Sequence, residues 1–419
     1  MTSKSSADSQ VIPVYTYWGA GPTQFADYSK KWSNSSVGGD NTGWKDLVAS
    51  HKQATNSMSA SRSFVDFQPY AHFGYEESVL GPGRDVNWHL KTGTTGFPNQ
   101  YCSLESVPLT VVHSATAIGK AVGSFNAKLD SFRTGFSGLT FLGELRESLS
   151  MIKNRTKLLR TDVTDTKRKL SRIFHSSRAR GVSGRTLTKN ATDVYLEAVF
   201  GWLPLMNDIR AAVGNLSPEP GYRVIAGTGE VISGGTPAFH AVGYADGSLC
   251  LLCDIYRSDK TVSQVKCVAE LSSKLAGMRE ENGLFFRDGS EQWGLSLRDF
   301  VPSAWELLPY SFLVDYFTNV GDVVAAPWCD RKAITWQYQT CRTTRVVGWS
   351  FRNLRSRSKG GIWMTNITAN PGAIRLGTKR FDRQPTVTLI PPFYLQYPEM
   401  GNLRWANLLA LWIQKTLTK

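Results

Sequence analysis

The spacing of hydrophobic and polar residues changes several times along the chain, and each change predicts a switch between strands and helices. Strand-like regions alternate polar residues with apolar ones, or gather β-branched and aromatic residues between Gly, Pro and Ser. Helical regions repeat apolar residues at steps of three and four. The predicted order is strand, helix, strand, helix, strand, helix, over residues 1–113, 114–216, 217–290, 291–325, 326–398 and 399–419.

This alternation predicts an α+β protein in which strand segments gather into one sheet and helical segments into one bundle. Each region would then be discontinuous in sequence. The final segment, 399–419, is amphipathic, which predicts a bundle helix, with a helix lying on a membrane surface as the alternative. We expect no membrane span, because no apolar run is long enough, and no signal peptide, because the first residues are polar.

The clearest helical pattern lies in residues 139–174, where apolar residues and Thr follow steps of three and four without a break. This is a heptad seam, and it predicts one helix about 50 Å long. A helix with a single apolar seam needs neighbours, and residues 115–133 and 191–214 are the natural ones. The seam consists of Leu142, Leu145, Leu149, Ile152, Thr156, Leu159, Val163, Thr166, Leu170 and Ile173.

Charge is unevenly distributed, and this indicates a polyanionic partner. The 419 residues carry a formal net charge of +14. Residues 141–190 contain 13 Lys and Arg against 4 Asp and Glu, and residues 331–383 contain 12 against one, so the rest of the chain is net acidic. Two concentrated basic segments favour nucleic acid as the partner, ahead of an anionic membrane.

Four cations of the heptad helix share one column. At heptad position e they would form a stripe about 32 Å long, which suits the phosphates of folded RNA. A solvated helix face is the alternative, although such a face usually mixes charges of both signs. The column is Arg146, Lys153, Arg160 and Lys167, and its candidate RNA-binding neighbours are Arg155, Lys157, Arg168, Lys169, Arg172, Arg178, Arg180 and Arg185.

The second basic segment interleaves Arg with aromatic residues in the stretch "CRTTRVVGWSFRNLRSRSK". Trp349 and Phe351 could stack on unpaired bases beside these guanidinium groups. An ordinary exposed pair of strands with a basic tip explains the pattern equally well, and both interpretations stay open.

Three acids lie in the apolar stretch "WELLPYSFLVDYFTNVGDVV", which begins at Trp305. Taken as one helix over 303–324, with a kink or restart at Pro309, its apolar residues fall on one face. Ser303 and Glu306 have capping-box spacing, and the two aspartates fall on the polar face. Glu306 and Asp315 would then project in different directions, so a packed helix is favoured over a catalytic carboxylate set of Glu306, Asp315 and Asp322.

Other signatures of chemistry are weak. The pair Cys250 and Cys253 has C-x-x-C spacing but no second pair at zinc-finger spacing, so buried thiols in a strand are favoured over a metal or redox site. We find no P-loop, no Gly-rich dinucleotide fingerprint and no zinc-protease or serine-hydrolase motif. We therefore expect no enzyme, no cofactor and no metal.

The acidic stretch resembles the most recognisable motif of the maturation (attachment) proteins of single-stranded RNA bacteriophages, the leviviruses. That family pattern runs W-E-x-x-P-[FY]-S-F-x-V-D-[WY], followed by V-G-[DN]. A second stretch, "FGWLPLMNDI", is similar to the family's other helical signature. The residues that carry the resemblance, with a structural role, include Phe200, Gly201, Trp202, Leu203, Pro204, Trp305, Glu306, Pro309, Ser311, Phe312 and Asp315.

The resemblance implies an elongated, curved antiparallel β-region together with an α-helical bundle. It implies a minor virion component, made in the host cytoplasm, that takes the place of a coat-protein dimer in the capsid shell and binds the genomic RNA. It also implies attachment to a host pilus, through pilin, and entry with the RNA. Some family members inhibit a host cell-wall synthesis enzyme as well. The alternatives are a cellular RNA-binding protein and a hydrolase that uses the three acids.

Overall fold

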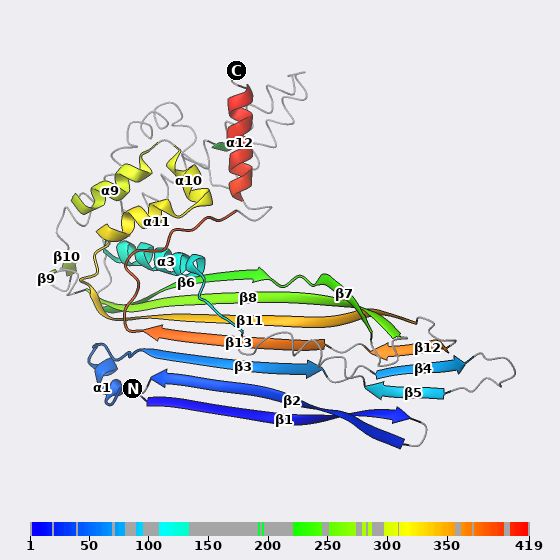
Figure 1. Ribbon diagram of the computed structural model, residues 1–419. Coiled ribbons are helices and arrows are strands. Elements are labelled where there is room, and N and C mark those ends of the chain that lie inside the picture. The colour runs from blue at the N-terminus through cyan, green and yellow to red at the C-terminus, as the bar shows by residue number, and fades with distance from the viewer. Residues whose placement is uncertain are drawn as a thin grey trace. The chain divides into compact units, whose positions relative to one another are not determined.

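A computed structural model provides the fold (Figure 1). It describes residues 2–18, 21–38, 41–68, 72–79, 89–94, 109–133, 192, 195–196, 221–244, 251–273, 279–281, 284–286, 297–308, 310–356, 362–370, 373–397 and 403–417.

Eleven strands in the described part of the chain form one large sheet. Their order is β12-β4-β5-β1-β2-β3-β13-β11-β8-β6, with β7 paired to β8. The pairings from β1 to β2, β3, β13 and β11 are all antiparallel. The bounds are β1 Thr2–Trp18, β2 Gly21–Gly38, β3 Met58–Gln68, β4 His72–Val79, β5 His89–Thr94, β6 Tyr222–Gly234, β7 Ala238–Tyr244, β8 Leu251–Ser272, β11 Ile334–Ser356, β12 Ile362–Asn370 and β13 Ala373–Gln384.

The helices are mostly short, and Figure 1 shows them between and after the long strands of the chain. A separate two-stranded sheet pairs β9 Arg279–Glu281 with β10 Leu284–Phe286. The helices are α1 Trp44–Ala49, α3 Ala115–Arg133, α9 Leu297–Glu306, α10 Ser311–Phe317, α11 Val320–Ala325 and α12 Leu403–Leu417, with a 3-10 turn η2 at Ala326–Trp328. None of the helices within the described ranges is long and apolar enough to cross a membrane.

The chain divides into two compact units, each assembled from three separate segments. The first, here called the β unit, comprises Met1–Ile118, Thr228–Cys267 and Tyr338–Val387. The second, here called the helical unit, comprises Gly119–Gly227, Val268–Gln337 and Thr388–Lys419.

Each unit has its own buried core. In the β unit, Ile255, Val347 and Leu376 come from three neighbouring strands and are fully buried. In the helical unit, α3 buries Phe125 and other apolar residues against the start of β6. Gly227 makes this contact possible, because a Cβ atom there would clash with the α3 backbone at Ala121 and Phe125.

The described residues combine helices with a large antiparallel sheet, in agreement with the predicted α+β class. The strands of the large sheet all lie in the first, third and fifth regions, and α3 and α12 lie in regions predicted to be helical. The small helix α1 was not predicted. The prediction of one helix over 303–324 is wrong, because three short helices occupy this stretch.

The break between α9 and α10 falls beside Pro309, as expected for a proline that cannot continue a helix. Tyr310 follows with a φ of 67°, in the left-handed region, which turns the chain between the two helices. The predicted capping box is also wrong, because Ser303 lies buried inside α9, whose first residue is Leu297.

Candidate functional site

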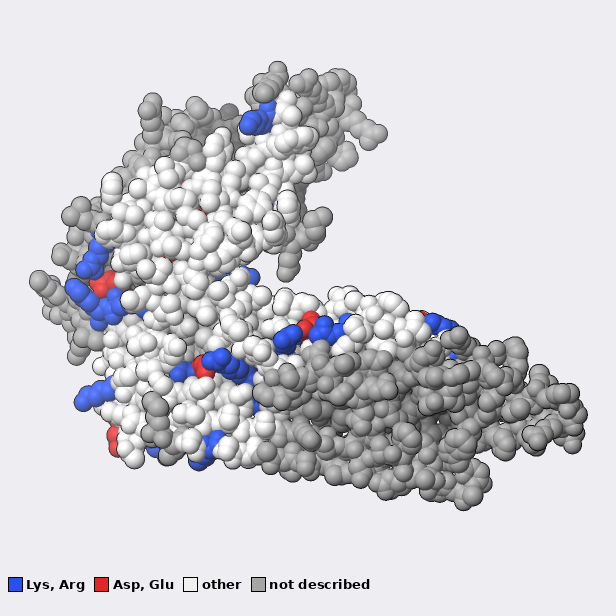
Figure 2. Space-filling view, in the orientation of Figure 1, with Lys and Arg blue, Asp and Glu red and all other residues white. Residues whose placement is uncertain are grey.

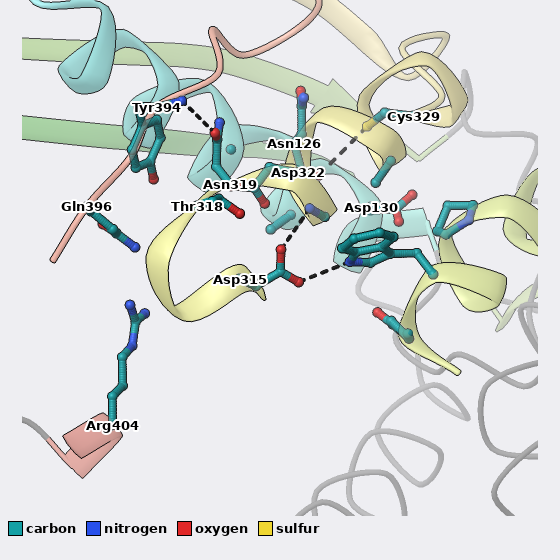
Figure 3. A pocket seen from close by; sticks show the side chains of 17 residues that line it. Asn126, Asp130, Asp315, Thr318, Asn319, Asp322, Cys329, Tyr394, Gln396 and Arg404 are labelled. Carbon is teal, nitrogen blue, oxygen red and sulfur yellow. Dashed lines mark hydrogen bonds between the residues drawn. The ribbon is translucent and has the colours of Figure 1, made fainter. Parts of the chain in front are cut away.

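The acidic motif surrounds a cavity of about 450 Å³ in the helical unit (Figure 3). Helices α3, α9, α10 and α11 contribute most of its wall, and the segment after β13 closes one side. The lining residues are Gly123, Asn126, Ala127, Asp130, Pro302, Trp305, Glu306, Asp315, Thr318, Asn319, Gly321, Asp322, Ala325, Cys329, Tyr394, Gln396 and Arg404.

Asp315 joins the three short helices of the motif. Its Oδ2 accepts a hydrogen bond of 3.0 Å from Nε1 of Trp305 in α9, and its Oδ1 accepts one of 2.9 Å from the backbone N–H of Gly321 in α11. Gly321 allows this approach, because a Cβ atom would lie 2.9 Å from Asp315 Oδ2 and 3.1 Å from Trp305 Nε1. Hydrogen bonds to a carboxylate are stronger than neutral ones. Trp305, Asp315 and Gly321 thus connect α9, α10 and α11, and we call these three residues the clamp.

Such a clamp is needed because the helices cannot hold themselves. Helices α10 and α11 contain 7 and 6 residues, far fewer than an isolated helix needs in water. Neither has a side-chain cap at its first turn. Bonds from outside each helix replace the missing caps, and the N–H of Gly321 is one of the donors thus satisfied.

Asp322 lies beside Asp315 in the cavity and against α3. A Cβ atom at Gly123 would clash with the Asp322 carboxyl, so this glycine leaves room for the acid. Asp322 remains accessible to solvent, yet desolvation by the surrounding atoms raises the pKa of its carboxyl, and the negative charge of Asp315 raises it further. Burial likewise raises the pKa of the Tyr394 phenol, with the charge of Asp322 as the second cause.

Asn319 ties the segment after β13 to the junction between α10 and α11. Its Nδ2 donates to the carbonyl of Pro392 at 2.9 Å, and its Oδ1 accepts from the N–H of Tyr394 at 2.9 Å. The N–H of Gln396 then donates to the carbonyl of Phe317 at 2.8 Å. Asn319 is only 4% exposed, so its amide is a buried crosslink with both groups satisfied.

The cavity brings together acids that the sequence argument had separated. Glu306, Asp315 and Asp322 all line it, from α9, α10 and α11, so Glu306 and Asp315 border the same cavity, although they were expected to project in different or distant directions. Asp315 nevertheless has each carboxylate oxygen engaged by a structural donor. Among the residues that the structure describes, no group of His, Cys, Asp and Glu has the arrangement of a metal site. The two bonds of Asp315 connect α10 to α9 and to α11.

A second polar cluster lies in the β unit and superficially resembles a catalytic triad. His113 contacts Oδ2 of Asp382 at 2.5 Å through Nε2 and Oγ1 of Thr343 at 2.8 Å through Nδ1, and Thr343 contacts Oγ of Ser263 at 2.9 Å. Thr343 is 0% and Ser263 1% exposed, so neither hydroxyl can meet a substrate. The chain of hydrogen bonds instead fixes residues before α3 to strands β8, β11 and β13.

Asp382 is the charged end of this cluster. Burial by itself raises the pKa of its carboxyl, but hydrogen bonds from Ser59, His113 and Arg380 together outweigh burial and hold the pKa below its usual value. Sequence reasoning missed this cluster, because its members lie in segments far apart in the chain.

The basic stretch around Trp349 has mainly structural contacts. Trp349 is 3% exposed, with His240 against its ring edge at 4.9 Å, so it cannot stack on a base, and that interpretation is wrong for this residue. Arg345 pairs with Asp259 at 2.6 Å and Arg355 with Asp254 at 2.8 Å. The hydrogen bond from Arg345 is the main reason that the pKa of Asp259 is lowered, although burial opposes it.

The whole of the predicted RNA-binding helix, 139–174, lies outside the described residues. This holds for the whole candidate set from Arg146 to Arg185, for the second motif from Phe200 to Pro204, and for Pro309. Cys250 also lies outside, while Cys253 belongs to β8. Of the motif that begins at Trp305, the structure thus brings Trp305, Glu306, Asp315, Gly321 and Asp322 to one cavity.

No protein-family model matches the chain, and no curated protein matches it either.

Proposed function

We propose that this chain is the maturation protein of a single-stranded RNA bacteriophage. In this function it is a virion component within the coat-protein shell, binds the genomic RNA and attaches the particle to a host pilus. The observation that carries the proposal is the motif from Trp305 to Asp322, in which the resembling residues Trp305, Asp315 and Gly321 also bond to one another. The Trp–Asp–Gly clamp gives a physical reason for three residues of the motif.

The charge distribution supports the RNA-binding part of this proposal. The segment 141–190 has a net charge of +9, and its heptad seam places Arg146, Lys153, Arg160 and Lys167 in one column. Contacts between such a column and phosphates position RNA without reading its bases. The pilus contact has no assigned residues in this proposal, and inhibition of a cell-wall synthesis enzyme is not part of it.

A fourfold charge reversal tests the RNA-binding helix. Changing Arg146, Lys153, Arg160 and Lys167 together to Glu should abolish packaging of the protein with its genome and lower the slope of log affinity against log salt by about 3. The matched control reverses four exposed lysines elsewhere, Lys45, Lys52, Lys260 and Lys266. If the fourfold variant binds genomic RNA with unchanged affinity and salt dependence, the column is not the RNA site.

A hydrolase is the second candidate, because three acids line one cavity. Glu306→Gln, Asp315→Asn and Asp322→Asn would each abolish turnover in an enzyme, whereas in a maturation protein they change only stability. The assay follows release of products from single-stranded RNA and from cell-wall glycan by the purified chain. Turnover that is lost in the Asp322→Asn variant, with the folded state intact, would overturn the structural interpretation of the cavity.

A cellular RNA-binding protein is a further alternative. A gene for a small coat protein beside the gene for this chain would argue against it.

A further inference from the structure

The β unit carries a groove of about 1000 Å³ whose composition is unusual for a protein surface. Strands β1, β2, β3, β13 and β11, which are adjacent in the sheet, form it. Five of its lining residues are Lys or Arg, six are Ser and one is Asn, and none of the described residues that line it is Asp or Glu. In the view of Figure 2, Lys and Arg also cover more of the described surface than Asp and Glu do.

The strand register places four of these cations on one face of the sheet. Directly opposed residues in antiparallel strands share a face, as do residues two apart in one strand. One row across the five strands therefore runs Arg342, Phe381, Ala60, Ser36, Lys4. The next row on the same face runs Thr344, Lys379, Arg62, Asn34, Ser6.

The two rows give the cations a defined spacing. Neighbouring strands lie about 4.8 Å apart, so Lys4 and Arg342 stand about 19 Å apart at the two ends of one row. Arg62 and Lys379 are directly opposed in the middle of the other row, about 7 Å further along the strands. Like charges directly opposed in a sheet are destabilising, so this pair weakens the isolated protein.

These cations also differ from their neighbours in pairing. Arg345, Arg355 and Arg380 on the same strands β11 and β13 each meet a carboxylate within 2.8 Å. Within the part of the chain that the structure describes, Lys4, Arg62, Arg342 and Lys379 have no acidic partner. Lys379 instead lies over the ring of Phe64 at 5.7 Å, and that ring occupies the space left by the missing Cβ of Gly377. Phe64 thus positions Lys379, while the positive charge of Lys379 remains available to a ligand.

We propose that this face binds the phosphodiester backbone of a single RNA strand, as a contact separate from the predicted helical column. Cations with short hydroxyl and amide donors are the groups that contact phosphates and sugars. A protein partner fits worse, because the cores of protein interfaces are depleted in Lys and Ser and enriched in aromatic residues. Contacts to phosphates and sugars carry no sequence information, so the binding would not depend on base sequence. This inference rests on the sheet register and does not require the proposed virion function.

Local protection tests the site in the full chain, where the helical column also binds RNA. Lysines are acetylated with and without an oligouridylate, and the modified peptides are quantified by mass spectrometry. We expect the RNA to slow acetylation of Lys4 and Lys379 and to leave Lys45 and Lys266, on the same unit, unchanged. Absence of protection at Lys4 and Lys379 under conditions where the RNA is bound overturns the proposal. Equal protection by polyglutamate at matched charge also overturns it, in favour of an acidic protein.

A triple variant supplies the second test. Arg62→Ser, Arg342→Ser and Lys379→Ser together should lower the salt slope of oligouridylate binding by about 2 and weaken binding at 0.1 M salt by about 100-fold in a chain whose helical column is already neutralised. The control changes Lys45, Lys52 and Lys266 to Ser, which removes the same charge. Equal effects of the two triple variants would show that net charge alone matters and would overturn the site. If the fourfold variant of the helical column binds RNA normally while RNA still protects Lys4 and Lys379, the proposed helical contact is wrong and the proposed sheet contact is supported.

Discussion

The two units maintain their shapes in different ways, and this difference separates structural residues from residues available for binding. In the β unit the backbone ladder fixes the shape, since β1 and β2 alone pair from Thr2 to Trp18. In the helical unit, helices of 6 and 7 residues depend on side chains such as Asp315 and Asn319. The polar residues of the motif are therefore engaged in holding the fold, whereas Lys4, Arg62, Arg342 and Lys379 on the sheet face have no acidic partner among the described residues.

This comparison predicts that the largest loss of stability comes from the clamp in the helical unit. Asp315→Ala should lower the free energy of unfolding by about 3 kcal/mol, because two hydrogen bonds to a charged acceptor are lost and their donors are left behind. The measurement is denaturant unfolding combined with hydrogen exchange. Exchange should accelerate in residues 297–325 and stay unchanged in β13.

Asp315→Asn is the matched control. The Asn amide keeps one oxygen acceptor, so this variant should lose about half as much stability as Asp315→Ala. A variant Asp315→Ala with the stability of the parent protein would show that the short helices do not depend on the clamp, and the comparison between the units would fail.

The second prediction concerns the β unit. His113→Phe keeps a ring but removes both nitrogen contacts, to Asp382 and to Thr343, so it should cost about 2 kcal/mol. Because the backbone ladder persists, exchange should accelerate at residues 109–114 and much less in β11. Thr343→Ser, which keeps the hydroxyl, is the control and should change stability little. Equal acceleration throughout β11 would mean that side chains hold this unit too.

The third prediction removes the buried amide that holds the segment after β13. Asn319→Ala loses its bonds to Pro392 and Tyr394, at a cost of about 1.5 kcal/mol. Exchange at the amides of Tyr394 and Gln396 reports the release directly. Thr318→Ala, one residue earlier, is the control. The Thr318 hydroxyl donates an exposed hydrogen bond to the carbonyl of Val314, so its removal should leave those two amides protected.

The sequence predicts the elements of both units better than it predicts either site. Periodicity depends on neighbours within a few residues, so it locates α3, α12 and the long strands. It predicts an interruption at Pro309, but neither the left-handed backbone of Tyr310 nor the second break before α11, and so it gave one helix with a kink or restart where three helices exist. The clamp joins residues up to 16 positions apart through that turn. Its letters were recognised as a motif, but their contacts could not be derived.

The cations of the sheet face could be predicted from the sequence even less well than the clamp. Its rows join β1, β3 and β13, whose residues are separated by up to several hundred positions. Lys4 lies in a Ser-rich stretch, Arg62 is the only cation of β3, and Lys379 is one of several cations in the basic segment 331–383. Only the register between distant strands reveals that they share a face, and a single sequence carries no information on that register.

The smallest predicted effect has the opposite sign and depends on pH. The folded state raises the pKa of Asp322, so the folded protein binds the proton more tightly than the unfolded chain does. Ionised Asp322 therefore destabilises the fold above its folded pKa, and this penalty disappears as the pH falls below the unfolded value, which is about 3.9. Asp322→Asn should raise the melting temperature at pH 7 and have no effect near the unfolded value.

Asp330→Asn in the same unit is the control of opposite sign. Burial alone would raise the pKa of Asp330, but the N–H of Lys332 and the side chain of Arg298 outweigh burial and lower it. Asp330 thus stabilises the fold above its unfolded pKa, and this stabilisation is lost as the pH falls through the folded pKa. Its amide variant should melt at a lower temperature at pH 7. If Asp322→Asn also melts lower at pH 7, Asp322 accepts stabilising bonds like Asp315, and the carboxyl against Gly123 is part of the clamp.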